Sequence, residues 1–81
     1  MTYEQVSKIL QKYETQTFLI SFKNRTAVEG LFIKGSDYDA LRRKNFWRIV
    51  TMAHMEAYLE SNDNGLAKIF YGDSFTRLSM V

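Results

Sequence analysis

The spacing of apolar residues changes along this chain from the period of a helix to that of a strand. Val6, Ile9, Leu10 and Tyr13 recur at i, i+3, i+4 and i+7, which places them on one face of a helix. Beyond residue 15 the apolar residues alternate with polar ones, beginning at Phe18, as they do in a half-buried strand. The pattern therefore predicts one helix followed by strands.

The helix is predicted over residues 3–14, where Thr2 and Gln5 have the spacing of a capping box. Five strands are predicted, over residues 17–23, 26–35, 46–61, 66–71 and 74–80. Gly30 lies inside the second, and a glycine there usually marks a sharp bend or a close backbone approach. Such a bend is what a very small barrel needs. The expected fold class is mainly β, in one domain over residues 1–81.

Two segments between these strands need interpretation. Gly35 to Asn45 is polar and basic, and is expected to be a loop. Residues 52–59 fit either a helical turn or a continued strand. We favour one long bent strand, because Asn-Asp-Asn-Gly at residues 62–65 follows it and is a strong hairpin signal.

The composition limits how so small a domain can be stabilised. A chain of 81 residues buries a modest share of its surface, and the usual supports are disulfides, a metal or self-association. The chain has no cysteine and a single histidine, His54, so disulfides are excluded and a structural zinc is disfavoured. A good core, an oligomer, or both remain. The net charge of +2 does not by itself indicate nucleic acid.

Two stretches of the chain have the form of sequence motifs. In the first, Lys23-Asn24 and Arg25 precede Val28-x-Gly30-x-Phe32. In the second, residues 69–73 (Ile-Phe-Tyr-Gly-Asp) are followed by Phe75 and Leu78. These stretches resemble the two motifs of the Sm-like family, which includes the Sm, LSm and Hfq proteins and usually has glycine at the position of Arg25. The resemblance implies an N-terminal α-helix followed by a bent five-stranded SH3-like small barrel.

The resemblance also implies a homo-oligomeric ring, in which the fourth strand of one subunit pairs with the fifth strand of the next. Five to seven subunits are expected by analogy with the family. Association agrees with the general need to pair apolar strand edges and to stabilise a small domain. The expected subunit interface consists of Ile69, Phe70, Phe75, Leu78 and Met80.

Sm-like rings bind single-stranded RNA around a central pore through two loops of each subunit. A gapless alignment from Gly30 places Tyr38 at the stacking position, whereas a gapped one places Asn45 at the family's asparagine. Both alignments keep the first contact loop within residues 37–45, which includes a basic run. The expected RNA-binding residues are Tyr38, Arg42, Arg43, Lys44, Asn45, Tyr71, Gly72 and Asp73.

The expected function is a ring that acts as a scaffold or chaperone in RNA processing or annealing. The alternative is an SH3-like protein-interaction module without a nucleic-acid role. An enzyme is not expected, because no nucleophile has both a base and an orienting partner in the sequence. No catalytic residue, cofactor or metal is assigned. No segment has the pattern of a signal peptide or a membrane span, so a cytoplasmic protein without a membrane partner is expected.

Overall fold

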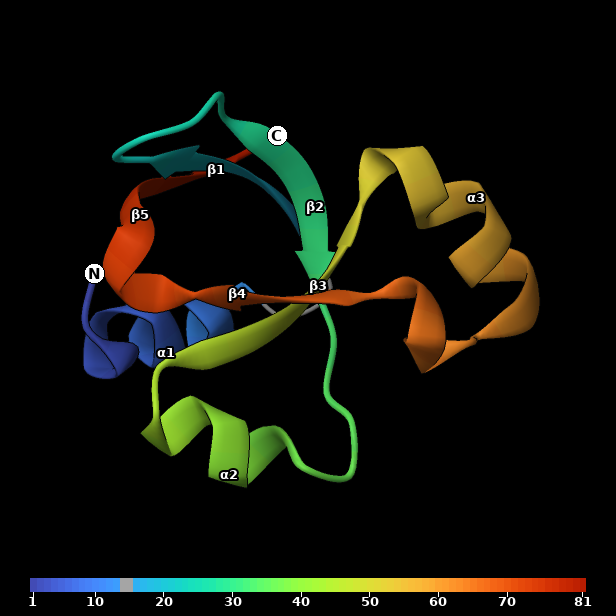
Figure 1. Ribbon diagram of the computed structural model, residues 1–81, viewed down its shortest axis with the longest axis horizontal. Helices are drawn as coiled ribbons and strands as arrows, with labels where there is room; N and C mark the ends of the chain where they lie inside the picture. The colour runs from blue at the N-terminus through green and yellow to red at the C-terminus, as the bar shows by residue number, and fades with distance from the viewer. Residues whose placement is uncertain (14–15) are drawn as a thin grey trace.

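A five-stranded antiparallel sheet forms the centre of the computed structural model, which describes residues 1–13 and 16–81. The elements follow in the order α1 (Tyr3–Lys12), β1 (Thr17–Phe22), β2 (Val28–Phe32), α2 (Tyr38–Arg43), β3 (Phe46–Thr51), α3 (Met52–Ser61), η1 (Asn64–Leu66), β4 (Lys68–Tyr71), η2 (Gly72–Ser74) and β5 (Phe75–Met80). The strand order is β4-β3-β2-β1-β5. Figure 1 shows the sheet bent round on itself, with α3 projecting from it.

The first helix begins as the sequence predicts. The Gln5 amide donates to Thr2 Oγ1 at 3.2 Å, and the Thr2 amide donates to Gln5 Oε1 at 2.9 Å, so the capping box is confirmed. Val6 and Leu10 bury their side chains against the sheet. The helix ends at Lys12, and residue 14, the last of the predicted helix, lies outside the described residues.

Gly30 makes the close backbone approach predicted for it. It lies opposite Thr51 in the pairing of β2 with β3. A Cβ at residue 30 would lie 2.6 Å from Ile49 Cγ2 and 3.0 Å from the Val50 carbonyl oxygen. Any larger residue at position 30 would therefore push β3 away from β2 at this pair.

The prediction of one long strand over residues 46–61 is wrong, because β3 ends at Thr51 and α3 begins at the next residue. Met55 is buried against Val50 in a second small core cluster. Asn62 ends the helix in the left-handed conformation (φ 54°), and its amide donates to the Tyr58 carbonyl at 2.7 Å. The Asn-Asp-Asn-Gly stretch therefore ends a helix and starts η1, and the predicted hairpin is wrong too.

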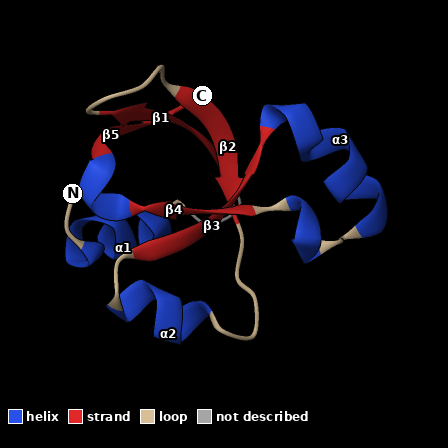
Figure 2. Ribbon diagram, viewed as in Figure 1, coloured by secondary structure: helices blue, strands red, loops and turns tan. Residues whose placement is uncertain are grey.

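The segment expected to be a loop, residues 35–45, contains the short helix α2. Tertiary contacts hold it, since Arg48 of β3 binds the Asp37 carboxylate with Nε at 3.2 Å and a terminal nitrogen at 2.7 Å. With α2 and α3, helices occupy about as many residues as strands (Figure 2), so the fold is mixed α/β rather than mainly β.

The main core lies between α1 and the concave face of the sheet. Its largest buried side chains are Trp47, Phe18 and Phe75, each at most 1% exposed. At the two edges of the sheet, β4 pairs with β3 and β5 pairs with β1. These two edge strands are not neighbours in the sheet, which is therefore not closed into a barrel.

Candidate nucleic-acid interface

The loop before β3 and the turn between β4 and β5 meet at Asn45. Asn45 has φ 63°, a left-handed conformation that asparagine tolerates better than most residues. Its carbonyl oxygen accepts the Gly72 amide at 2.7 Å. The two segments that carry most of the predicted RNA contacts are thus joined by a backbone hydrogen bond.

The Asn45 side chain fastens the same junction. Its Oδ1 accepts the Trp47 indole N–H at 2.8 Å, and its Nδ2 donates to Asp73 Oδ1 at 3.0 Å and to the Met1 carbonyl at 2.8 Å. A Cβ at residue 72 would overlap this amide, so only glycine fits beside it. Asn45 and Gly72 are both buried, and they hold the two segments together rather than present a surface.

Tyr71 and Asp73 lie exposed beside that junction. The Tyr71 ring packs on Phe46, the residue opposite it in β3, with the ring centroids 5.2 Å apart. Hydrogen bonding to Asp73 raises the pKa of the Tyr71 phenol, and the same interaction is the main cause that lowers the pKa of Asp73. Tyr71 is 48% exposed, so an aromatic surface that a base could stack on remains open to solvent.

The basic run consists of one cation that forms an ion pair and two exposed cations that form none with the described residues. Arg42 is half-buried, pairs with Asp39 at 3.6 Å and has a buried Nε without a hydrogen-bond partner. Arg43 and Lys44 are exposed, and no ion pair joins either of them to a carboxylate in the part of the chain that the structure describes. Two of the three predicted cations are therefore placed to meet a phosphate.

The structure does not bring Tyr38 to the Tyr71 side of the sheet. The Tyr38 ring packs on Trp47 at 6.1 Å, with Lys34 Nζ 5.4 Å from its centroid. Trp47 follows Phe46 in β3, and successive side chains of a strand point to opposite faces. The two predicted RNA-binding tyrosines are thus anchored on opposite faces of β3, and Tyr38 is only partly exposed.

The predicted subunit-interface residues fall into three classes of exposure. Ile69 on β4 and Met80 on β5 are about half exposed at the two edges of the sheet. Phe70 and Leu78 are half-buried and pack against the main core. Phe75 is 1% exposed and belongs to the core of its own chain, so its side chain does not reach an edge.

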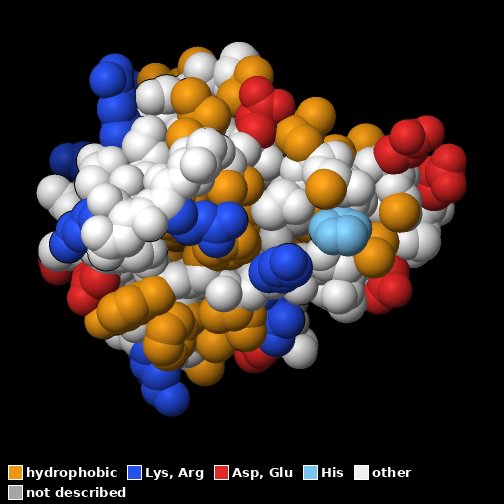
Figure 3. Space-filling view, turned by 45° about the horizontal axis from the view of Figure 1, so that its top comes forward, with side chains coloured by type: hydrophobic (Ala, Val, Ile, Leu, Met, Phe, Trp, Pro, Cys, Tyr) orange, Lys and Arg blue, Asp and Glu red, His pale blue; other side chains and the backbone are white. Residues whose placement is uncertain are grey.

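Sequence reasoning missed Phe46 as the residue beneath Tyr71. Its role depends on the register of β3 against β4, for which the sequence carries no signal once the predicted hairpin fails. Figure 3 shows acidic side chains at the end of the molecule formed by α3, and others elsewhere on the same face near lysine and arginine side chains.

Comparison of the chain with known protein families, curated proteins and solved structures found no match. Among residues 1–13 and 16–81, no helix has the length and apolar character needed to cross a membrane. Nor do the described residues contain a group of three or more His, Cys, Asp or Glu side chains that could hold a metal ion.

Proposed function

We propose that this chain assembles into a homo-oligomeric Sm-like ring of five to seven subunits that binds single-stranded RNA, as a scaffold or chaperone in RNA processing or annealing. One observation carries the proposal: β4 and β5 follow each other in sequence but lie at opposite edges of a curled sheet. The resemblance requires this arrangement, since the fourth strand of one subunit pairs with the fifth strand of the next.

The curvature of the sheet supports a small barrel as the subunit. The Phe22 ring on β1 contacts the Phe70 ring on β4, with centroids 5.7 Å apart, although two other strands separate β1 from β4 in the sheet. The outer strand β4 therefore curls back toward β1. The gap left between β4 and β5 is where a neighbour's strand would add.

The character of the two edges favours assembly. Unpaired strand edges are usually protected by charge, proline or a covering segment. Here the exposed apolar side chains Ile69 and Met80 lie on the edge strands beside the exposed cations Lys68 and Arg77, and the sequence has no proline. Pairing β4 with a neighbour's β5 would satisfy the backbone groups of both edges and cover these side chains.

Of the predicted RNA-binding residues, Arg43, Lys44, Tyr71 and Asp73 are exposed. Arginine and lysine meet phosphates, and an aromatic ring stacks on unpaired bases, a combination suited to single strands. The contact of Asn45 with Gly72 supports the alignment that places Asn45 at the family's asparagine, with Asn45 as a positioning residue. The region between the two motifs then contains α2 and α3.

The ring is tested by light scattering at micromolar concentration. We expect a mass five to seven times that of one chain, and Ile69→Lys should convert the assembly to monomers by placing a charge on the edge. Leu19→Lys is the matched control, because Leu19 is similarly exposed but lies on β1, which is paired on both sides. A monomeric wild type would refute the ring, and an assembly unaffected by Ile69→Lys would refute pairing through the β4 edge.

RNA binding is tested separately by fluorescence anisotropy with U-rich and A-rich oligonucleotides at low and moderate salt. We expect binding that weakens as salt is added. An assembly that binds neither oligonucleotide at low salt would refute the RNA role and favour the alternative, an SH3-like protein-interaction module.

A further inference from the structure

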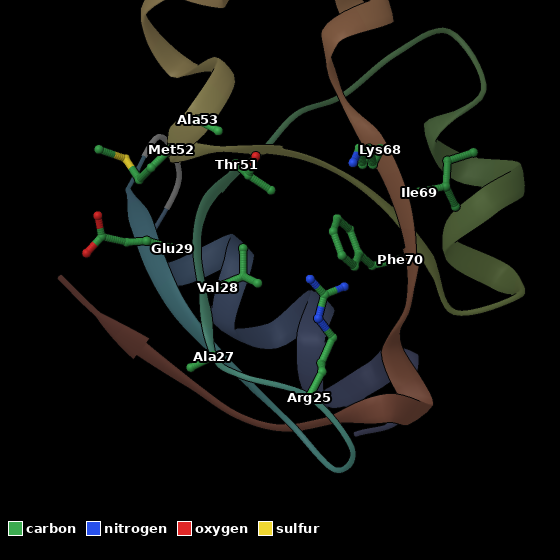
Figure 4. Close-up of a pocket in the computed structure, with 10 residues that line it drawn as sticks. All are labelled: Arg25, Ala27, Val28, Glu29, Thr51, Met52, Ala53, Lys68, Ile69 and Phe70. Carbon is green, nitrogen blue, oxygen red and sulfur yellow. The ribbon is translucent and has the colours of Figure 1, made fainter.

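A cavity of about 570 Å³ opens at one end of the curled sheet. Its walls come from the turn between β1 and β2, the start of β2, the junction of β3 with α3, and β4, and no residue of α1 lines it. Figure 4 looks into this opening. The residues used below are Arg25, Val28, Glu29, Lys68 and Phe70. Mouths of small barrels and cavities of this size are common places for a small ligand.

Two cations line the cavity. In Figure 4 the guanidinium of Arg25 and the ammonium of Lys68 point toward the middle of the opening, whereas the Glu29 carboxylate points away from both. No ion pair joins Arg25 or Lys68 to a carboxylate in residues 1–13 and 16–81. The opening therefore carries positive charge that the described chain does not neutralise.

Arg25 is held in place before any ligand arrives. Its guanidinium carbon lies 5.1 Å from the Phe22 ring centroid and 5.6 Å from that of Phe70. Packing on two rings limits the freedom of the guanidinium and leaves its N–H groups free to donate. A guanidinium so oriented loses little further entropy when it binds an oxyanion in its planar fork.

Packing on aromatic rings accounts for the position of the Arg25 side chain. It does not account for that of Lys68, for which no cation–π contact is found in the described residues. The opening is also lined by the apolar side chains Val28 and Phe70. Both cations are exposed, so a bound anion would remain partly solvated while it contacts them. The cavity thus combines two unneutralised cations with a surface suited to a hydrocarbon or aromatic body.

We propose that the opening binds a small organic oxyanion, with a carboxylate or phosphate between Arg25 and Lys68 and an apolar or aromatic body against Val28 and Phe70. This site is distinct from the RNA-contact residues, and two residues that line it, Ile69 and Phe70, also belong to the predicted subunit interface.

The site is tested by titrating the ¹⁵N-labelled full chain with 2-naphthoate, adenosine monophosphate and inorganic phosphate, followed by amide chemical shifts. We expect saturable shifts centred on Arg25, Val28 and Phe70 with at least one organic anion, which binds more tightly than inorganic phosphate. The naphthoate and nucleotide arms distinguish a carboxylate from a phosphate ligand.

Lys68→Gln and Arg25→Gln should each weaken that binding by about tenfold, the usual effect of removing one charge-assisted hydrogen bond. Lys8→Gln is the control, because Lys8 is an exposed cation on α1, outside the cavity. Since the Lys68 side chain makes no hydrogen bond or ion pair within residues 1–13 and 16–81, Lys68→Gln tests the site even if Arg25→Gln impairs folding. Binding of neither organic anion at millimolar concentration, shifts centred elsewhere, or unchanged affinity in Lys68→Gln would overturn the proposal.

Discussion

The Asn45 carbonyl accepts the Gly72 amide at 2.7 Å, and this bond joins the loop that follows α2 to the turn between β4 and β5. The partners are 27 residues apart in sequence. Because Asn45 also binds Trp47 and Asp73 through its side chain, one buried residue positions both segments of the candidate RNA interface.

Gly72→Ala tests how tightly this junction is packed. The added Cβ would overlap the Asn45 amide, so we predict a loss of about 1–3 kcal/mol in the free energy of unfolding. Gly65→Ala is the control, since its Cβ would meet only the exposed Asp63 side chain, and it should change stability by less than about 1 kcal/mol. Urea unfolding followed by Trp47 fluorescence measures the stability of both variants. Equal losses of stability would mean that the Asn45 side chain can move to accommodate the added Cβ.

Asn45→Ala and Asn45→Gly separate the side chain of Asn45 from its backbone conformation. Both substitutions leave the buried Trp47 indole N–H without its acceptor, which we expect to cost about 1–3 kcal/mol. Alanine in addition disfavours φ 63°, by about 1–2 kcal/mol, whereas glycine does not. The glycine variant should therefore unfold at a higher urea concentration than the alanine variant, and the opposite order would contradict the left-handed conformation.

Met55→Ala tests the helix α3 that replaced the predicted strand. Met55 is 9% exposed and packs with Val50 and Ile33, so truncation should cost about 2–3 kcal/mol. Leu59, one helical turn later, is 65% exposed, and Leu59→Ala should be nearly neutral. A loss in Leu59→Ala as large as that in Met55→Ala would contradict the packing of α3, in which Met55 is buried and Leu59 is exposed.

The pair of Asp37 and Arg48 predicts a dependence of stability on pH. Hydrogen bonds from Arg48 lower the pKa of Asp37 below its usual value of 3.8. A carboxyl group with a lowered folded-state pKa contributes stability above its unfolded pKa, and this is lost as pH falls through the folded pKa. The urea midpoint should therefore fall less between about pH 6 and about pH 2 in Asp37→Asn than in wild type.

Arg48→Gln removes the partner and should reduce the same pH dependence. Circular dichroism at each pH supplies the midpoints. If both variants lose as much stability in acid as wild type, the interaction between Asp37 and Arg48 does not contribute to the pH dependence of stability.

Lys44→Gln tests the RNA contact assigned to the basic loop. If Lys44 meets one phosphate, its loss should weaken binding of every oligonucleotide and reduce the slope of log affinity against log salt by about 0.7. Lys8→Gln, on the exposed side of α1, should leave both unchanged. Anisotropy titrations at several salt concentrations measure the slope, and identical slopes for wild type and Lys44→Gln would remove Lys44 from the interface.

Local patterns predicted the parts of the fold that depend on neighbouring residues. The capping box of Thr2 and Gln5, the alternation in β1 and the close approach at Gly30 could be read from the sequence because each has a short-range signal. The start of α3 could not, since Met55 suits either period and only its packing on Val50 decides between them.

The candidate site was predictable in its segments but not in its geometry. The second motif marked Tyr71 to Asp73, and the basic run marked Arg42 to Lys44. That Asn45 is buried between them depends on contacts across the sheet. The placement of Tyr38 and Tyr71 on opposite faces follows from the register of β3, which no local pattern encodes.

The pairing of β1 with β5 has a consequence for biosynthesis. Phe18 of β1 pairs with Met80 of β5, so the sheet cannot be completed until residue 80 has left the ribosome. Until then the core lacks Phe75, and β1 exposes one apolar edge. Because contacts so distant in sequence form slowly and leave strands open to wrong partners, nascent copies of this chain on one messenger RNA are at risk of exchanging their last strand.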